Sequence, residues 1–244
     1  MLKAFDIAKM IDHSLLRPEF TLAQVIDGLA VARRYETATV CVRPCDVVLA
    51  ARELAGSPVL VSTVIGFPHG TLHPASKVFE AEQAICDGAV ELDMVMNFSR
   101  LLSGEDEQVA EEIKAVVDVA HKRGAIVKVI LENCYLTDDL KVKACRICEK
   151  AGADFVKTST GFGSGGATLD DLRLMRRTVS EKVRVKAAGG IRTLDQLLAA
   201  RAAGAVRCGA TATEAIMTEA LLREKEGTLK ELVHDGGAEP GKGY

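Results

Sequence analysis

Asp154-Phe155-Val156-Lys157-Thr158-Ser159-Thr160-Gly161-Phe162-Gly163 begins as a short apolar strand and ends in a lysine, three hydroxyl residues and two glycines. A lysine at the end of a buried strand loses hydration, which favours the neutral, nucleophilic amine. Glycines after the strand leave backbone N–H groups accessible to an anion such as phosphate. For a lysine taken alone, the alternative is a structural ion pair that caps the strand. Its neighbours along the chain decide between these interpretations.

Apolar runs alternate with helical patterns on both sides of this stretch. The predicted strands cover residues 10–16, 39–42, 59–65, 90–95, 126–131, 154–157, 183–187 and 206–208. Helices are predicted after Thr21 and after Pro44, and over residues 76–87, 105–123, 137–151, 169–179, 193–203 and 213–226. The strands are short and apolar on both faces, which is typical of a parallel sheet covered by helices. Eight strand–helix units in 244 residues predict an α/β fold, the (β/α)8 TIM barrel.

The domain organisation follows from the same pattern. No linker or low-complexity block interrupts residues 1–226, so they are predicted to form a single TIM-barrel domain. Residues 227–244 fall outside the pattern and are rich in turn-forming residues. They are predicted to form a flexible C-terminal tail.

Composition excludes several classes of function. A net charge of −3 gives no electrostatic footprint for nucleic acid or an anionic membrane surface. The first residues do not read as a secretory signal, and no apolar run is long enough to span a bilayer. Seven cysteines scattered along the chain indicate reduced thiols and a cytoplasmic location. Cys145 and Cys148 lie within a predicted helix, where a buried pair is favoured over a zinc site that would need four ligands.

Ionisable residues gather at the carboxyl ends of the predicted strands, where TIM barrels place their active sites. Lys157 and Lys186 end neighbouring strands, and Asp93 lies on the strand at 90–95. If both lysines point into the barrel, their mutual repulsion lowers one pKa and frees an amine. Asp93 is placed to hold a water or a hydroxyl and to move protons. The alternative is a polar network that fills one layer of the barrel.

Three adjacent loops after the last strands carry glycines. Barrel enzymes often bind phosphate in such loops, with a helix N-terminus directed at it, although any single glycine can serve only as a turn. We therefore predict a phosphorylated substrate. The predicted phosphate-binding residues are Gly161, Gly189, Gly190, Arg192, Gly209 and Thr211.

From about residue 11 to residue 216 the sequence resembles the deoxyribose-phosphate aldolases, class I aldolases of the barrel type. The resemblance depends on motifs in a fixed order. These motifs are Ile11-Asp12-His13-Ser14-Leu15-Leu16, Val40-Cys41-Val42-Arg43-Pro44, Val64-Ile65-Gly66-Phe67-Pro68-His69-Gly70, Glu91-Leu92-Asp93-Met94-Val95, Val127-Lys128-Val129-Ile130-Leu131-Glu132, Cys134-Tyr135-Leu136-Thr137, Lys157-Thr158-Ser159-Thr160-Gly161-Phe162-Gly163 and Lys186-Ala187-Ala188-Gly189-Gly190-Ile191-Arg192.

The resemblance implies reversible cleavage of 2-deoxy-D-ribose 5-phosphate to D-glyceraldehyde 3-phosphate and acetaldehyde, without a metal or other cofactor. It assigns the Schiff-base nucleophile to Lys157, and proton transfer and pKa lowering to Asp93 and Lys186. It implies supporting positions for Lys128, Asp12 and Cys41. The terminal Tyr244 matches members of the family in which a final tyrosine is linked to proton transfer at the substrate methyl carbon.

Three positions depart from the family pattern. Thr211 is followed by Ala212 where members usually carry a hydroxyl pair, so one hydroxyl is lost. Phe162 stands where some members have a lysine. Arg43 stands where an asparagine is frequent, and by parity with Cys41 it is predicted to face the pocket.

Three other functions compete with this interpretation. A Schiff-base aldolase of the same fold could act on a different sugar phosphate. A metal-dependent aldolase or isomerase would need histidines at strand ends, but the histidines are scattered at positions 13, 69, 73, 121 and 234. A non-catalytic binding barrel would not need the intact set of Asp93, Lys157 and Lys186.

The family resemblance also implies a homodimer.

Overall fold

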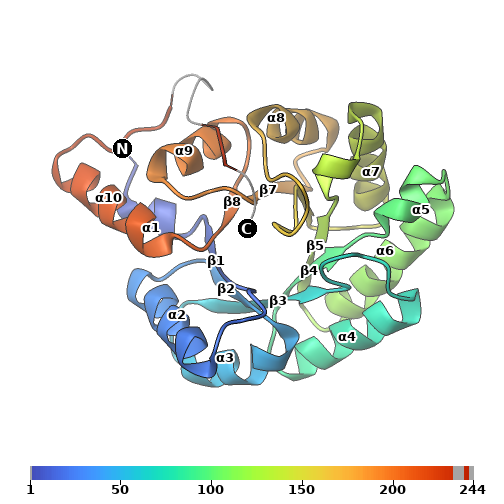
Figure 1. The fold of residues 1–244 in the computed structure, drawn as a ribbon, viewed down its shortest axis with the longest axis horizontal. Helices are drawn as coiled ribbons and strands as arrows, with labels where there is room; N and C mark the ends of the chain where they lie inside the picture. Colours follow the sequence, from blue (N-terminus) through green and yellow to red (C-terminus); the bar gives the residue numbers. More distant parts are fainter. Residues whose placement is uncertain (1, 233–238, 242–244) are drawn as a thin grey trace.

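The computed structural model describes residues 2–232 and 239–241, which form a closed barrel of eight parallel strands. Each strand pairs with the next, and β8 pairs with β1. Figure 1 shows the helices as a ring outside the strands. The strands are β1 (Ile11–Leu15), β2 (Thr39–Val42), β3 (Leu60–Ile65), β4 (Glu91–Val95), β5 (Ile126–Ile130), β6 (Phe155–Lys157), β7 (Arg184–Ala188) and β8 (Arg207–Ala210).

The helices fall between the strands as the barrel prediction requires. They are α1 (Ala4–Ala8), α2 (Leu22–Tyr35), α3 (Val47–Glu53), α4 (Pro74–Cys86), α5 (Phe98–Leu102), α6 (Asp106–Lys122), α7 (Asp138–Lys150), α8 (Leu169–Thr178), α9 (Leu194–Ala202) and α10 (Thr213–Lys225). Two 3-10 turns, η1 (Pro44–Asp46) and η2 (Asn133–Tyr135), precede α3 and α7.

The predicted TIM barrel and its eight strands are confirmed, with strand ends within two residues of their predicted positions. The helices predicted from residue 76 onward are confirmed with the same accuracy. Thr21 caps α2, because its side chain accepts a hydrogen bond from the backbone of Gln24. The sequence did not predict α1 and α5, which have five residues each and are too short for a helical period to be seen.

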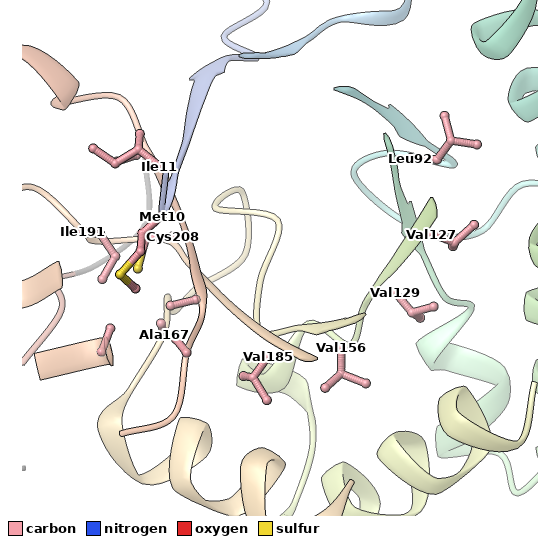
Figure 2. Packing of buried hydrophobic residues seen from close by; sticks show 14 of the residues in the cluster. Met10, Ile11, Leu92, Val127, Val129, Val156, Ala167, Val185, Ile191 and Cys208 are labelled. Carbon is pink, nitrogen blue, oxygen red and sulfur yellow. The ribbon is translucent and has the colours of Figure 1, made fainter. Parts of the chain in front are cut away.

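Side-chain alternation along the strands separates an apolar shell outside the barrel from an interior that holds the buried charged residues. Leu92, Val156 and Val185 are fully buried between the strands and the surrounding helices. Figure 2 shows these side chains pointing away from the centre of the barrel. The residues between them in sequence, such as Asp93 and Lys157, therefore face the interior.

The remaining predictions concern parts of the chain outside the barrel interior. Cys145 and Cys148 are confirmed as buried residues in the apolar shell on α7. Among the described residues, no helix is both long and apolar enough to cross a membrane. The described parts of the predicted tail, residues 227–232 and 239–241, contain no helix or strand. Tyr244 lies outside the described residues.

Candidate active site

Strand register brings the predicted catalytic residues to neighbouring positions in the barrel. Lys157 on β6 pairs with Lys186 on β7, and Asp93 on β4 pairs with Lys128 on β5. Lys157 pairs on its other side with Ile130, two residues beyond Lys128. The prediction that the two lysines lie at similar depth is therefore confirmed, and Lys128 lies one layer deeper.

Asp93 is the centre of the charged cluster. Its Oδ2 accepts hydrogen bonds from Lys157 Nζ and Lys186 Nζ, each at 2.7 Å. Its Oδ1 accepts one from Lys128 Nζ at 2.8 Å. All four side chains are at most 4% exposed. One buried carboxylate thus connects three amines, and a proton could pass between two of them through Oδ2.

A second group of charges lies beneath Asp93. Asp12 pairs with Lys186 and with Arg207, and Glu91 contacts Lys128 Nζ at 2.6 Å and Arg207 Nη2 at 3.1 Å. The sequence patterns did not single out Glu91 or Arg207 as site residues. The signal was present, because Glu91 has the parity of Asp93 and Arg207 has the parity of Gly209 on their strands.

The pKa values separate Lys157 from the other two amines. Burial lowers the pKa of Lys157, and the positive charge of Lys186 lowers it further against the opposing effect of Asp93. Burial alone would lower the pKa of Lys186 as well, but Asp12 and Asp93 raise it above its ordinary value. Burial likewise opposes a charged Lys128, yet its carboxylate neighbours, chiefly Asp93, raise the pKa of Lys128. Lys157 is therefore the amine of this cluster that loses its proton most readily.

The acidic groups and the thiol of the site have definite protonation states at neutral pH. Burial would raise the pKa of Asp93, but the three surrounding ammonium groups hold it well below its ordinary value. Burial would also raise the pKa of Asp12, but Lys186, Lys128 and Arg207 outweigh that effect and lower it. Burial raises the pKa of the Cys41 thiol, so Cys41 is a neutral group facing Asp93 and the two lysines. The site thus contains ionised carboxylates and an unionised thiol.

A pocket opens directly above these charges. Lys157, Lys186, Asp12 and Cys41 line its floor and lower wall. The residues predicted to bind phosphate line the same pocket, and they are Gly161, Gly189, Gly190, Arg192, Gly209 and Thr211. The structure therefore brings together the predicted nucleophile, the glycine loops after β6 and β7, and the end of β8, where Gly209 lies within the strand rather than in the loop that was predicted to follow it.

The loop after β7 has a backbone that only glycine adopts readily. Gly189 and Gly190 have φ values of +84° and +91°. A Cβ atom at Gly190 would lie 1.9 Å from the carbonyl oxygen of Gly241, whose N–H donates to the Gly190 carbonyl at 2.9 Å. Glu239 binds nearby, accepting a hydrogen bond from the backbone N–H of Leu169 at 3.2 Å. Residues 239–241 thus lie against the wall of the pocket.

The three departures from the family pattern lie outside the lining of this pocket. Arg43 pairs with Asp46 at 2.7 Å and donates to the backbone carbonyls of Pro18 and Phe20. The prediction that Arg43 faces the pocket is therefore wrong, because its guanidinium is engaged by the loop after β1. Ala212 occupies the N-cap position of α10. Phe162 packs edge-on against Phe67, with ring centroids 5.4 Å apart.

Glu132 is a further site residue that the sequence patterns did not assign. It is buried, and its φ of +55° is unusual for a residue other than glycine. Its carboxylate accepts hydrogen bonds from the backbone N–H and the hydroxyl of Thr160, in the loop that follows Lys157. Burial raises the pKa of Glu132. Glu132 therefore fixes the start of the glycine loop after β6.

The donor groups of the described residues are not arranged as a metal site. Within residues 2–232 and 239–241, no three histidine, cysteine, aspartate or glutamate side chains are grouped so that they would hold a metal ion. The independence from metal that the family resemblance implies stays a prediction.

Known proteins align with most of this chain and are identical to it at about half of the aligned positions. The profile of the DeoC/LacD family aldolases matches residues 4–216. A deoxyribose-phosphate aldolase from Rhodopirellula baltica is 53% identical over 215 residues, covering 88% of this chain and 89% of that protein. One from Listeria monocytogenes is 52% identical over 212 residues, covering 87% of this chain and 95% of that protein.

A solved structure agrees with these sequence relatives. The tetrameric deoxyribose phosphate aldolase from Aeropyrum pernix superposes with a TM-score of 0.83 at 31% identity, covering 89% of this chain and 92% of that one. The family match extends over most of the chain and includes every strand that contributes to the charged cluster. The chain therefore belongs to the DeoC/LacD family of aldolases.

Proposed function

We propose that this aldolase cleaves 2-deoxy-D-ribose 5-phosphate reversibly to D-glyceraldehyde 3-phosphate and acetaldehyde through a Schiff base on Lys157. The observation that carries the proposal is the charge distribution in the pocket floor. The pKa of Lys157 is lowered, whereas the pKa values of Lys186 and Lys128 are raised. A neutral amine at the base of a pocket is the group required to attack an aldehyde.

In the proposed reaction, the Lys157 amine adds to the C1 aldehyde and loss of water gives a protonated imine. The C2–C3 bond then breaks as the C3 hydroxyl loses its proton, and the imine accepts the electron pair as an enamine. D-Glyceraldehyde 3-phosphate leaves. Protonation of the enamine at C2 and hydrolysis release acetaldehyde and restore the amine.

Asp93 and Lys186 are proposed to move the protons of these steps. Asp93 Oδ2 contacts both Lys157 Nζ and Lys186 Nζ at 2.7 Å, so it is within reach of a proton on either amine. Lys128 and Asp12 are proposed to support this network by holding Asp93 and Lys186 in place. Cys41 is proposed to complete the pocket wall beside the imine as a neutral thiol.

The substrate phosphate is proposed to bind at the opposite wall of the pocket. Gly161, Gly189, Gly190 and Gly209 expose backbone there, and Arg192 and Thr211 add a cation and a hydroxyl. The N-terminus of α10 follows Thr211 directly, which favours an anion at this position.

Tyr244 is proposed to carry the proton to or from C2 of the enamine. Gly241 is hydrogen-bonded to Gly190 in the pocket wall. Tyr244 is three residues beyond Gly241 in the sequence. A phenol at that position would serve as an acid or a base.

The assembly and location of the protein are also proposals. Seven cysteines are free, which supports a reducing, cytoplasmic environment. We propose a homodimer, whereas the deoxyribose phosphate aldolase from Aeropyrum pernix is a tetramer. Analytical ultracentrifugation distinguishes the two assemblies.

The test is a cleavage assay that follows both products by NMR. The proposal predicts acetaldehyde and glyceraldehyde 3-phosphate from 2-deoxyribose 5-phosphate, a weaker reaction with unphosphorylated 2-deoxyribose, and none with Lys157→Leu. Activity is expected to survive prolonged treatment with a strong chelator. Preference for a longer sugar phosphate would favour the related Schiff-base aldolase, and rescue by zinc after chelation would favour a metal-dependent enzyme.

A further inference from the structure

Arg207 lies beneath the pocket rather than in it, and its contacts connect it to the site. Its guanidinium pairs with Asp12 on β1 and with Glu91 on β4, and 14% of its side chain is exposed. Asp12 in turn pairs with Lys186, and Glu91 pairs with Lys128. One carboxylate therefore links Arg207 to Lys186 and another links it to Lys128, which are two of the three lysines in contact with Asp93.

The cluster has a simple charge balance. Its four basic groups are Lys128, Lys157, Lys186 and Arg207, and its three carboxylates are Asp12, Glu91 and Asp93. With all four bases protonated the cluster carries one excess positive charge, and with one base neutral it carries none. An excess charge in a buried cluster is costly. An arginine does not release its proton in proteins. One of the lysines must therefore give up its proton for the cluster to be neutral.

We propose that Arg207 is a positioning residue of the catalytic centre, which orients Asp12 and Glu91 from below and supplies the fixed charge that leaves the Lys157 amine neutral. The inference rests on the proposed function of Lys157. Arg207 acts through the total charge of the cluster, which determines whether Lys157 is protonated. Lys186, by contrast, acts on Lys157 directly from the adjacent strand.

The surroundings of Arg207 and Lys157 contain few other titratable groups. Arg207 lies against the Phe155 ring, with its guanidinium carbon 5.9 Å from the ring centroid. Arg184 lies over the same ring at 4.1 Å. Beyond Asp93 and Lys186, the groups that act on Lys157 are the neutral Cys41 thiol and Glu132, whose pKa is raised.

The test is the pH dependence of imine formation. Each variant is mixed with acetaldehyde and borohydride across a range of pH, and the adduct on the Lys157 peptide is measured by mass spectrometry. Arg207→Met removes the fixed charge and leaves three lysines facing three carboxylates. Lys157 should then stay protonated to higher pH, moving the midpoint of trapping upward by about one unit.

Three further variants keep the inference falsifiable. Glu91→Gln removes a negative charge and should move the midpoint downward. The double variant Arg207→Met with Glu91→Gln restores the balance and should return the midpoint toward the original value. Arg184→Met is the matched control, since Arg184 stacks on the same Phe155 ring and makes no ion pair within the part of the chain that the structure describes. Its midpoint should not move.

A trapping midpoint that is unchanged in both Arg207→Met and Glu91→Gln would overturn the inference. A midpoint of the double variant that lies further from the original value than that of either single variant would also overturn it. If Arg207→Met does not fold, Glu91→Gln tests the inference alone. A downward shift of its trapping midpoint supports the inference, and an unchanged midpoint contradicts it. A failure of the proposed function is distinct from these outcomes, because the unmodified protein itself would then form no adduct at Lys157.

Discussion

Charge at the level of single side chains determines whether Lys157 can act as a nucleophile. Desolvation and the neighbouring Lys186 lower its pKa, while Asp93, in contact with both amines, opposes them. Sequence alternation was sufficient to predict that Asp93, Lys157 and Lys186 share the barrel interior. It was not sufficient to predict the deeper layer, because the pairing of Asp12 with Lys186 and of Glu91 with Arg207 depends on three-dimensional register and side-chain reach.

Replacing Lys186 tests the effect of its charge on Lys157. In Lys186→Leu the neighbouring cation is lost, so the pKa of Lys157 should rise by about one unit or more. Activity near neutral pH should fall strongly and recover in part in alkaline solution. The pH–rate profile measures this shift. Lys141→Leu removes a lysine that pairs with Asp138 and Asp171 outside the barrel, and it should leave the profile unchanged. A profile for Lys186→Leu that keeps its shape would contradict the charge effect.

His13 gives a pH-dependent contribution to stability. It is 5% exposed, its Nδ1 lies 2.8 Å from Thr213 Oγ1, and burial lowers its pKa from 6.5 to about 4. Between these values the unfolded chain binds more protons than the folded chain, so the free energy of unfolding falls as pH falls from 6.5 to 4. The full loss is about 3 kcal/mol.

Urea unfolding at several pH values between about 7 and about 4 measures this contribution. In His13→Gln the stability should fall less steeply with decreasing pH than in the unmodified protein. Equal slopes for the two proteins would contradict a buried neutral His13.

Among the elements, the loop after β7 is the one whose conformation most constrains the site. Gly190 combines a φ of +91° with close contact to Gly241. Gly190→Ala should therefore displace the pocket wall and raise the KM for a phosphorylated substrate by about tenfold, the effect of about 1.4 kcal/mol of lost binding. Imine trapping with acetaldehyde should persist, because that reaction needs no phosphate.

Gly56→Ala is the matched control for this substitution. Gly56 has a φ of +73°, but a Cβ atom there would meet nothing within 4 Å. Both variants carry the backbone strain of a left-handed residue, and only Gly190→Ala should change KM. Equal KM values in the two variants would show that the conformation of the loop after β7 does not affect binding of the phosphate.

Strands and long helices were predictable because their apolar patterns are regular and their ends carry turn residues. The loops were less predictable. Arg43 has the parity of Cys41, but β2 ends at Val42 and the chain turns into η1, so strand parity no longer applies to Arg43. Glu132 lies two residues beyond the end of β5 in a left-handed conformation, where strand and helix periodicity no longer predict the direction of a side chain.

At the scale of the whole molecule, closing the barrel brings distant parts of the chain into one site. Asp12 and Arg207 lie 195 residues apart in sequence and are paired across the closure of β1 with β8. The number and order of strand–helix units predicted this closure from the sequence. The contact of residues 239–241 with the loop after β7 carried no sequence signal, since it depends on backbone hydrogen bonds.

The C-terminal residue offers a test of how the tail contributes to turnover. Tyr244→Phe, or deletion of Tyr244, should slow cleavage by about a hundredfold, the lower end of the range for acid–base catalysis. Trapping of the imine at Lys157 should persist, because imine formation does not require proton transfer at C2. Full activity without the phenol would contradict a role for Tyr244.

The assignment of the nucleophile is tested most directly by borohydride reduction in the presence of acetaldehyde, followed by mass mapping of the peptides. We expect one added ethyl group, located on Lys157, and no adduct in Lys157→Leu. An adduct on Lys186 instead, or a Lys157→Leu variant that is still trapped, would contradict this assignment.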